Sequence, residues 1–114
     1  TAKLYYDLGT YTGNASYTAD MRINGNNFLA CITTAQNALK DYPYTSMRED
    51  ISILLLRAKH KLGSESVLEK KEERMRETID EYYAFKNEFP ESKYMKEVEA
   101  IYKDASKYVK ELNE

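Results

Sequence analysis

Apolar residues recur at helical spacing along most of the chain. Steps of three and four residues predict one helix over residues 2 to 12 and another over residues 28 to 42. Pro43 ends the second helix, because proline lacks an amide donor and disfavours helical geometry in the residue before it. Residues 14 to 26 carry Asn, Ser, Thr and Gly without sustained periodicity. We expect that segment to form an extended loop.

Two matches to the S-x-x-E capping box predict where the next helices begin. Ser46 with Glu49, and Ser66 with Glu69, would satisfy the free amides of a helix start. The first of these helices is expected to end at Gly63, since glycine favours the backbone geometry that follows a helix. The second is a long helix that reaches about residue 88.

A final helix is predicted after Pro90, over residues 92 to 112, with Ser92 as its cap. The chain is therefore predicted to be all-α, with about five helices and one apolar stripe on each. From the second helix onward the stripes are Phe28, Ile32, Ala35, Leu39 and Tyr42; Met47, Ile51, Leu54, Leu55, Ala58 and Leu62; Met75, Ile79, Tyr82 and Phe89; and Tyr94, Val98, Ile101, Ala105, Tyr108 and Leu112.

The chain also repeats itself. Pro43 and Pro90 are 47 residues apart, and the same shift aligns apolar residues on both sides of the two prolines. One helix pair cannot bury its apolar stripe alone, whereas stacked pairs bury a continuous seam. The pattern predicts an α-α superhelix, a single module over residues 1 to 114. Its repeat units would span about residues 1 to 43 and 44 to 90, followed by the terminal helix.

Several of these positions resemble tetratricopeptide repeats. "LYYDLGTY" resembles the first helix of such a repeat, small residues of the second helix match its packing positions, and Pro43 matches the closing proline. The matching residues are Leu8, Gly9, Tyr11, Cys31, Ala35 and Ala38. The usual 34-residue period is not kept, because the loop over 14 to 26 and the stretch "SESVLEKKEERMR" lengthen the units.

The segments "NFLACITTAQNALKDYP", "DYPYTSMREDISILLLRAKHKL" and "EFPESKYMKEVEAIYKDASKYV" further resemble the BamD family, lipoproteins of the β-barrel assembly machinery in the outer membrane of Gram-negative bacteria. The resemblance implies a non-catalytic scaffold at the periplasmic face of the outer membrane, with a lipid anchor outside this sequence. Its implied partners are the BamA periplasmic domains and other Bam lipoproteins. A Tol-Pal-associated or cytosolic repeat adaptor stays an alternative, since Tol-Pal accessory proteins share the Tyr-Pro-x-Ser turn.

Composition and charge narrow the function classes. Seventeen basic and nineteen acidic residues give a formal net charge of -2, and no basic face is evident, which disfavours nucleic-acid binding. The longest apolar run, residues 53 to 56, is far shorter than a membrane span. The chain opens at Thr1, without Met, directly into a helical pattern. We therefore expect a fragment of a longer protein.

Few residues are candidates for catalysis or metal binding. His60 is the only histidine, and no second ligand lies three or four residues away, so we expect it on a polar helix face. Cys31 lacks a neighbouring His or Lys that would activate it, which favours a small buried residue. A helical enzyme would need an inward cluster of ionisable residues, and the predicted stripes contain none. We expect no catalytic residue, cofactor or metal.

The helix over residues 28 to 42 offers a candidate partner surface. If its stripe faces the core, Ala30, Thr33, Thr34, Asn37 and Lys40 face away, and only the lysine is charged. Arg57 and Lys61 would flank this surface if the next helix packs antiparallel. A charge-depleted surface suits contact with a protein partner, although small polar residues also permit close packing of the preceding loop.

Tyrosines supply the alternative contact surface. Tyr82 lies on the predicted stripe of the long helix and Tyr83 lies beside it. Tyrosine gives a large contact area at a low cost in conformational entropy, which is why it is enriched in interfaces. Tyr42, Tyr94 and Tyr108, on other stripes, are expected to be core residues with a hydroxyl at the rim.

Overall fold

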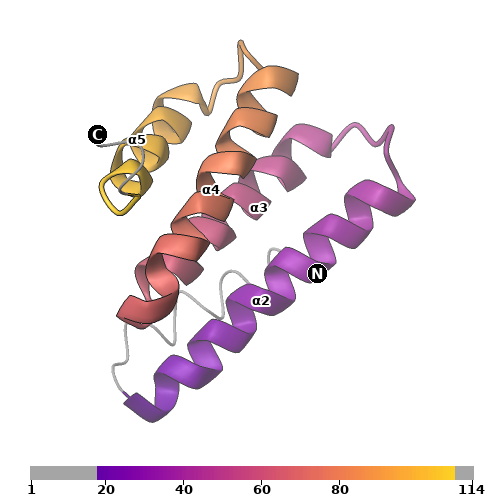
Figure 1. Cartoon of the computed structure of the whole chain (residues 1–114). Coiled ribbons are helices and arrows are strands. Elements are labelled where there is room, and N and C mark those ends of the chain that lie inside the picture. Colours follow the sequence, from indigo (N-terminus) through magenta and orange to yellow (C-terminus); the bar gives the residue numbers. More distant parts are fainter. Residues whose placement is uncertain (1–17, 110–114) are drawn as a thin grey trace.

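The computed structural model describes the backbone of residues 18 to 109 and the side chains of residues 28 to 109. Four helices form this part of the chain: α2 (Thr18–Asp41), α3 (Arg48–Ser64), α4 (Leu68–Glu88) and α5 (Met95–Ser106) (Figure 1). Residues 18 to 109 contain no strand, which confirms the all-α class. The helix predicted over residues 2 to 12 lies outside the described residues.

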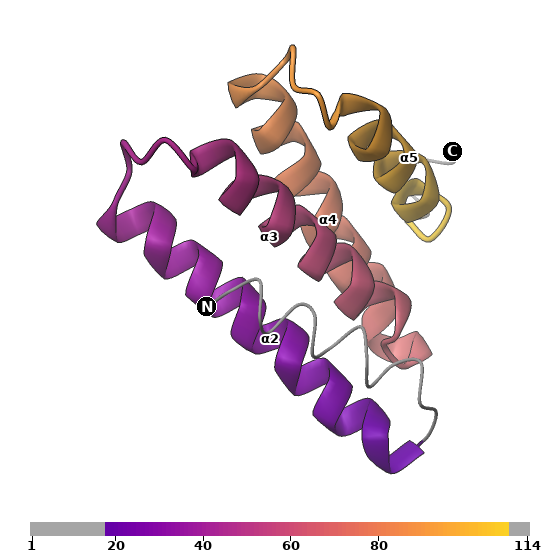
Figure 2. The same cartoon turned by 180° about the vertical axis from the view of Figure 1, so that it is seen from behind.

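Successive helices pack side by side. α2 lies against α3, α3 against α4 and α4 against α5, as both views show (Figures 1 and 2). α3 also contacts α5, two helices further along the chain. α3 is therefore the central helix of the described fold, with neighbours on several sides.

The prediction of a loop over residues 14 to 26 is wrong from residue 18 onward, because α2 begins at Thr18. The helix continues through Gly25, Asn26 and Asn27. Each of these residues costs a helix only about 0.5 to 1 kcal/mol relative to alanine. Tertiary packing of a long helix routinely outweighs such propensities, so a cluster of weak helix formers does not by itself make a loop. Residues 14 to 17 lie outside the described part of the chain.

The first proline turn, residues 42 to 47, connects α2 to α3. The amide of Thr45 donates to the carbonyl oxygen of Tyr42 at 3.1 Å, and the amide of Arg48 donates to that of Thr45 at 3.2 Å. The hydroxyl oxygen of Thr45 accepts the amide of Met47 at 3.2 Å. Thr45 thus organises both sides of the turn.

The second proline turn, residues 89 to 94, repeats this arrangement between α4 and α5. The amide of Ser92 donates to Phe89 at 3.1 Å, that of Met95 donates to Ser92 at 3.1 Å, and the hydroxyl oxygen of Ser92 accepts the amide of Tyr94 at 3.0 Å. Every position corresponds to one 47 residues earlier. The recurrence of Pro43 and Pro90 in the sequence is therefore a recurrence of turn geometry.

The capping-box predictions are wrong at both helix starts. The N-cap residues are Met47 and Val67, and neither makes a side-chain cap hydrogen bond. In the first turn, Thr45 rather than Ser46 supplies the hydroxyl, because Met47 occupies the N-cap position. The partner of Glu49 is the hydroxyl of Ser92, far along the chain.

Gly63 does not end α3, which continues to Ser64. A Cβ atom on Gly63 would lie 3.1 Å from the sulfur of Met75, a fully buried side chain of α4. Glycine therefore permits close approach of α4 here. Beyond the helix, the Ser66 hydroxyl accepts a hydrogen bond from Arg74 at 2.6 Å and donates to the carbonyl oxygen of Leu62, so Ser66 joins α3 to α4 instead of capping α4.

The core lies where α3, α4 and α5 meet. One cluster combines residues of all three helices: Ile53, Leu56, Tyr82, Phe85, Val98 and Ile101. A second cluster joins Met75 and Ile79 of α4 to Ala105 and Val109. Phe28, Cys31 and Ala35 of α2 are fully buried. The predicted stripe of α5 is largely confirmed, whereas that of α3 omitted Ile53 and Leu56 and that of α4 omitted Phe85.

Three stripe residues are not core residues. Tyr42 is 69% exposed, Met47 57% and Tyr108 41%. All three lie in turns just outside the helices, where helical spacing no longer directs a side chain. The expected burial of Tyr42 and of Tyr108 is wrong for that reason. α5 ends at Ser106, so the final helix is shorter than predicted, and Leu112 lies outside the described residues.

The paired turns give a first prediction. Ser92→Ala removes both the acceptor for the Tyr94 amide and the donor to Glu49, and we expect a loss of about 1 to 2 kcal/mol in the free energy of unfolding. Thr45→Ala removes the equivalent turn bond alone, at about 1 kcal/mol or less. Urea unfolding of both variants measures the difference. Equal losses would show that the bond between Ser92 and Glu49 contributes nothing to stability.

Candidate interaction surfaces

The outer face of α2 carries the predicted partner surface. Thr33, Asn37 and Lys40 are exposed, whereas Ala30 and Thr34 are half-buried. The exposed members are polar, and Lys40 is the one charged residue of the predicted set on this helix. The structure thus leaves Thr33, Asn37 and Lys40 accessible, while it partly encloses Ala30 and Thr34.

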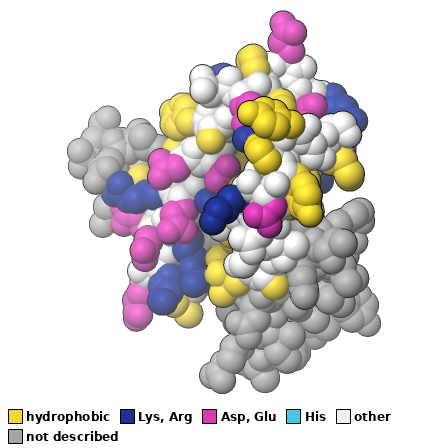
Figure 3. Space-filling view, turned by 90° about the vertical axis from the view of Figure 1, so that its right-hand side faces the viewer, with side chains coloured by type: hydrophobic (Ala, Val, Ile, Leu, Met, Phe, Trp, Pro, Cys, Tyr) yellow, Lys and Arg dark blue, Asp and Glu magenta, His cyan; other side chains and the backbone are white. Residues whose placement is uncertain are grey.

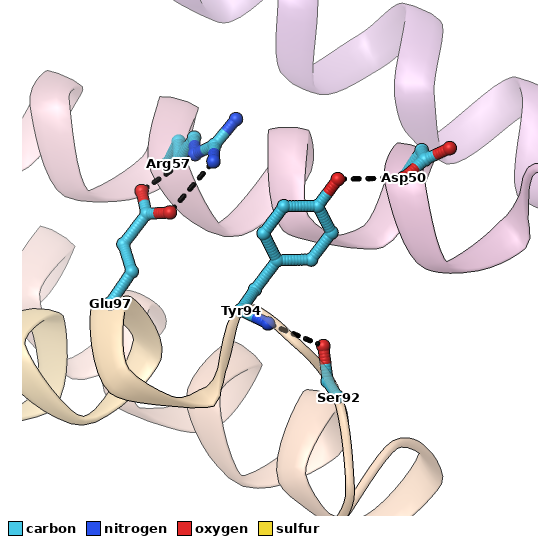
Figure 4. Close-up of polar contacts among 5 residues, drawn as sticks. All are labelled: Asp50, Arg57, Ser92, Tyr94 and Glu97. Carbon is cyan, nitrogen blue, oxygen red and sulfur yellow. Dashed lines mark hydrogen bonds and ion pairs between the residues drawn. The ribbon is translucent and has the colours of Figure 1, made fainter.

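Arg57 and Lys61 lie beside α5. Both line a shallow hollow of about 250 Å³ between α3 and α5, together with His60, Glu97, Ala100 and Ile101. The guanidinium of Arg57 points toward α5 (Figure 4). Both residues thus lie on the side of α3 that faces α5, and their role beside the α2 surface stays a prediction.

A polar seam joins α3 to α5. Arg57 donates two hydrogen bonds to the carboxylate of Glu97, both at 2.7 Å, and the hydroxyl of Tyr94 donates to Asp50 at 2.9 Å (Figure 4). Further along, His60 Nε2 lies 2.7 Å from Asp104 Oδ2. The contacts follow the same order along both helices. α3 and α5 therefore run parallel, as equivalent helices of successive repeats do.

The seam contributes more to register than to stability. The side chains of Arg57 and Glu97 are 30% and 41% exposed, and ion pairs exposed to this degree typically contribute about 0.2 to 1 kcal/mol. Their two parallel hydrogen bonds nevertheless fix one relative position of the helices. Arg57 also lies over the ring of Tyr94, with its guanidinium carbon 5.4 Å from the ring centre. A shift of α5 by one turn would break these contacts together.

Tyr82 and Tyr83 have different environments. Tyr82 is 3% exposed and stacks on Tyr102 at 4.4 Å between ring centres, whereas Tyr83 is 52% exposed. The Tyr82 hydroxyl donates to Glu99 at 3.0 Å, and Lys86 donates to that hydroxyl at 3.3 Å. Burial raises the pKa of Tyr82; Lys86 opposes this rise and Glu99 adds to it. Tyr82 is thus a core residue, and Tyr83 presents the accessible ring.

Candidate chemistry in the described residues is limited. Cys31 is buried, as expected, and the ring of His60 faces Asp104. Between residues 28 and 109, no three His, Cys, Asp or Glu side chains come together as metal ligands would. Within the described part of the chain, no helix has both the length and the hydropathy of a membrane span.

Sequence reasoning missed the seam because its partners lie far apart in the chain. Arg57 and Glu97 are separated by 40 residues, and His60 and Asp104 by 44. The first separation is shorter than the 47-residue repeat by about two helical turns, and the second is shorter by about one turn. The repeat, combined with opposite charges at this offset, was a signal in the sequence that could have identified the seam.

No protein-family model matches the chain, and no curated protein matches it. Inferences about function therefore depend on the chain's own residues and on the resemblance that those residues carry.

Proposed function

We propose that this chain is a non-catalytic helical-repeat scaffold of outer-membrane β-barrel assembly that binds partner subunits, foremost the BamA periplasmic domains, at the periplasmic face of the outer membrane. The observation that carries the proposal is the recurrence of one helix-turn-helix geometry at an interval of 47 residues. Tetratricopeptide-like proteins stack such units and use the resulting surface to hold other proteins. The Tyr-Pro and Phe-Pro turns are also the segments in which the chain resembles the BamD family.

Two further features support a binding role. α3 and α5 run parallel and are tied by side-chain contacts, which is the relation expected of equivalent helices in a stack. The exposed positions of the α2 surface, Thr33, Asn37 and Lys40, are polar and carry little charge. Surfaces depleted of charge are typical of the central part of protein interfaces.

The test uses an exposed position of the α2 surface. Asn37→Glu adds a charge where we expect the BamA domains to bind, and it should weaken their binding by at least about 1 kcal/mol, or roughly fivefold in Kd. Thr33→Glu, at another exposed position, should have a similar effect. Isothermal titration with purified BamA periplasmic domains measures both variants.

Asn87→Glu is the matched control, because Asn87 is also an exposed asparagine and lies near the end of α4. It should leave binding unchanged, and all three variants should keep the melting temperature of the parent chain. If Asn37→Glu and Asn87→Glu weaken the binding of the BamA domains equally, the α2 surface is not the binding site. If the parent chain does not bind the BamA domains but binds Tol-Pal components, the result would favour the alternative, a Tol-Pal-associated adaptor.

A further inference from the structure

Three tyrosines meet where α4 packs on α5. Tyr82 stacks on Tyr102, with 4.4 Å between the ring centres and 22° between the ring planes. Tyr83 meets both rings edge-on, and its ring centre lies 4.9 Å from that of Tyr82 and 5.8 Å from that of Tyr102. Among residues 28 to 109, close ring contacts between tyrosines occur only in this group. In this part of the chain, chemistry that needs two phenol rings in contact is therefore confined to α4 and α5.

Tyr83 and Tyr102 also bring their hydroxyls together. The Tyr83 hydroxyl donates to that of Tyr102 at 3.4 Å, and this contact is exposed to solvent. The Tyr82 hydroxyl instead donates to Glu99 and accepts a hydrogen bond from Lys86. The hydrogen bond to Tyr102 is the main cause that raises the pKa of Tyr83. Tyr83 therefore keeps its proton, and with it this contact, at neutral pH.

Two phenols in this arrangement are placed for oxidative coupling. A one-electron oxidant removes one electron and one proton from each phenol, and the unpaired electron that remains is shared with the ring carbons beside the oxygen. A bond between one such carbon of each ring gives a biaryl, in which both hydroxyls lie next to the new bond. The hydroxyl contact between Tyr83 and Tyr102 thus already brings together the parts of the two rings that must join.

We propose that Tyr83 and Tyr102 form an oxidative modification site, at which an oxidant of the haem-peroxidase class joins α4 to α5 through a dityrosine cross-link. After the carbon–carbon bond forms, each bonded ring carbon gives up its hydrogen as a proton while the oxygen of that ring takes a proton back, which restores the hydroxyl. Overall, the pair loses two electrons and two protons, and these convert one hydrogen peroxide into two waters. The site concerns the helical module itself and does not depend on the proposed binding of BamA.

Exposure alone would select other tyrosines. Tyr44 is 97% exposed and Tyr42 69%, and hydrophobic side chains gather in the upper part of the face on which the α2–α3 turn lies (Figure 3). Neither of these two rings contacts another tyrosine ring among the described residues. Tyr82 stacks on Tyr102 but is buried, so coupling would require its ring to leave the core. Tyr83, which is 52% exposed, combines contact with access.

The test treats the full chain, at low concentration, with a haem peroxidase and hydrogen peroxide. Dityrosine fluorescence should appear, the protein should stay monomeric in denaturing electrophoresis, and its intact mass should fall by two hydrogen atoms. Trypsin cuts after Lys and Arg, so it should release residues 77 to 86 joined to residues 97 to 103. Fragmentation of the joined peptide should then place the bond on Tyr83 and Tyr102.

Three variants separate this pair from other tyrosines. Tyr83→Phe and Tyr102→Phe should each reduce the yield of the joined peptide at least about tenfold, because the remaining phenol loses the partner that was held against it. Tyr44→Phe is the matched control, since it removes a hydroxyl from a more exposed ring that contacts no other described tyrosine ring. It should leave the yield unchanged. Circular dichroism checks that all three variants stay folded.

The cross-link should also stabilise the protein. It joins residues 19 apart in the sequence, and a link of this kind restricts the unfolded chain. The treated parent chain should therefore melt at least about 5 °C above the equally treated Tyr83→Phe variant. A cross-linked chain that melts with the variant would overturn the idea that the bond holds α4 to α5.

Other outcomes would overturn the modification site itself. They are covalent dimers as the main product, a bond that maps to Tyr82, and absence of the joined peptide under conditions that couple free tyrosine. An equal loss of the joined peptide in Tyr44→Phe and Tyr83→Phe would do the same. Failure here with intact BamA binding would leave the proposed function standing.

Discussion

Leu56→Ala is expected to lower the free energy of unfolding by about 2 to 5 kcal/mol, which is the range for large-to-small changes in a packed core. Leu56 is fully buried, and its cluster contains residues of α3, α4 and α5. Because the three helices meet at this side chain, no single helix can move to fill the space that the change creates. A cavity that cannot collapse gives the upper part of the range.

Leu68→Ala is the matched control, since it makes the same chemical change at a leucine that is 85% exposed. It should cost under about 0.5 kcal/mol. Urea unfolding monitored by circular dichroism measures both variants, and the slope of the free energy against urea should stay that of the parent chain. Similar midpoints for the two variants would mean that Leu56 is not where α3, α4 and α5 meet.

The sequence predicts the proline turns well because proline acts locally. Pro43 and Pro90 remove an amide donor and restrict the preceding residue, and α2 and α4 end at Asp41 and Glu88, two residues before each proline. The predicted caps failed for the opposite reason. Glu49 had a local partner in its sequence motif, but its hydrogen-bond partner in the fold is Ser92 of the next repeat. A local motif cannot show that a distant residue, here Ser92, will compete for the same carboxylate.

The stripe of α3 shows a similar limit. A single face at helical spacing describes a helix with one packed side, as on α5, where Val98, Ile101 and Ala105 are buried as predicted. α3 packs against α2, α4 and α5, so Ile53 and Leu56 are buried as well. Their apolar character was visible in the sequence, but the number of neighbours around a helix is a property of the whole fold.

The candidate surfaces were predictable to differing degrees. The exposure of Asn37 followed from its place opposite the stripe of α2. The position of Arg57 did not, because it depends on how α5 lies on α3, and its partner Glu97 is 40 residues away. Tyr82 belonged to the predicted stripe and is buried, as that pattern indicates, while its neighbour Tyr83 faces solvent.

The start of α2 differs most from the sequence prediction and gives the second large effect. Gly25 is the eighth residue of α2 (Thr18–Asp41), whereas the sequence placed it in a loop. Gly25→Pro removes an amide that lies inside the helix, and the proline ring clashes with the carbonyl group four residues earlier. We expect the free energy of unfolding to fall by about 3 kcal/mol or more.

Gly25→Ala should have the opposite sign. Alanine is favoured over glycine inside a helix by about 1 kcal/mol, partly because glycine loses more conformational freedom on folding. If residue 25 lay in an extended loop, helix propensity would not affect the free energy of unfolding of either variant. The proline could even stabilise the protein by restricting the unfolded chain. Urea unfolding of both variants therefore distinguishes a helix from a loop at Gly25 by the sign of each change in the free energy of unfolding. A proline variant as stable as the parent chain, with no gain from alanine, would return residues 18 to 26 to a loop and shorten α2 to begin near Phe28.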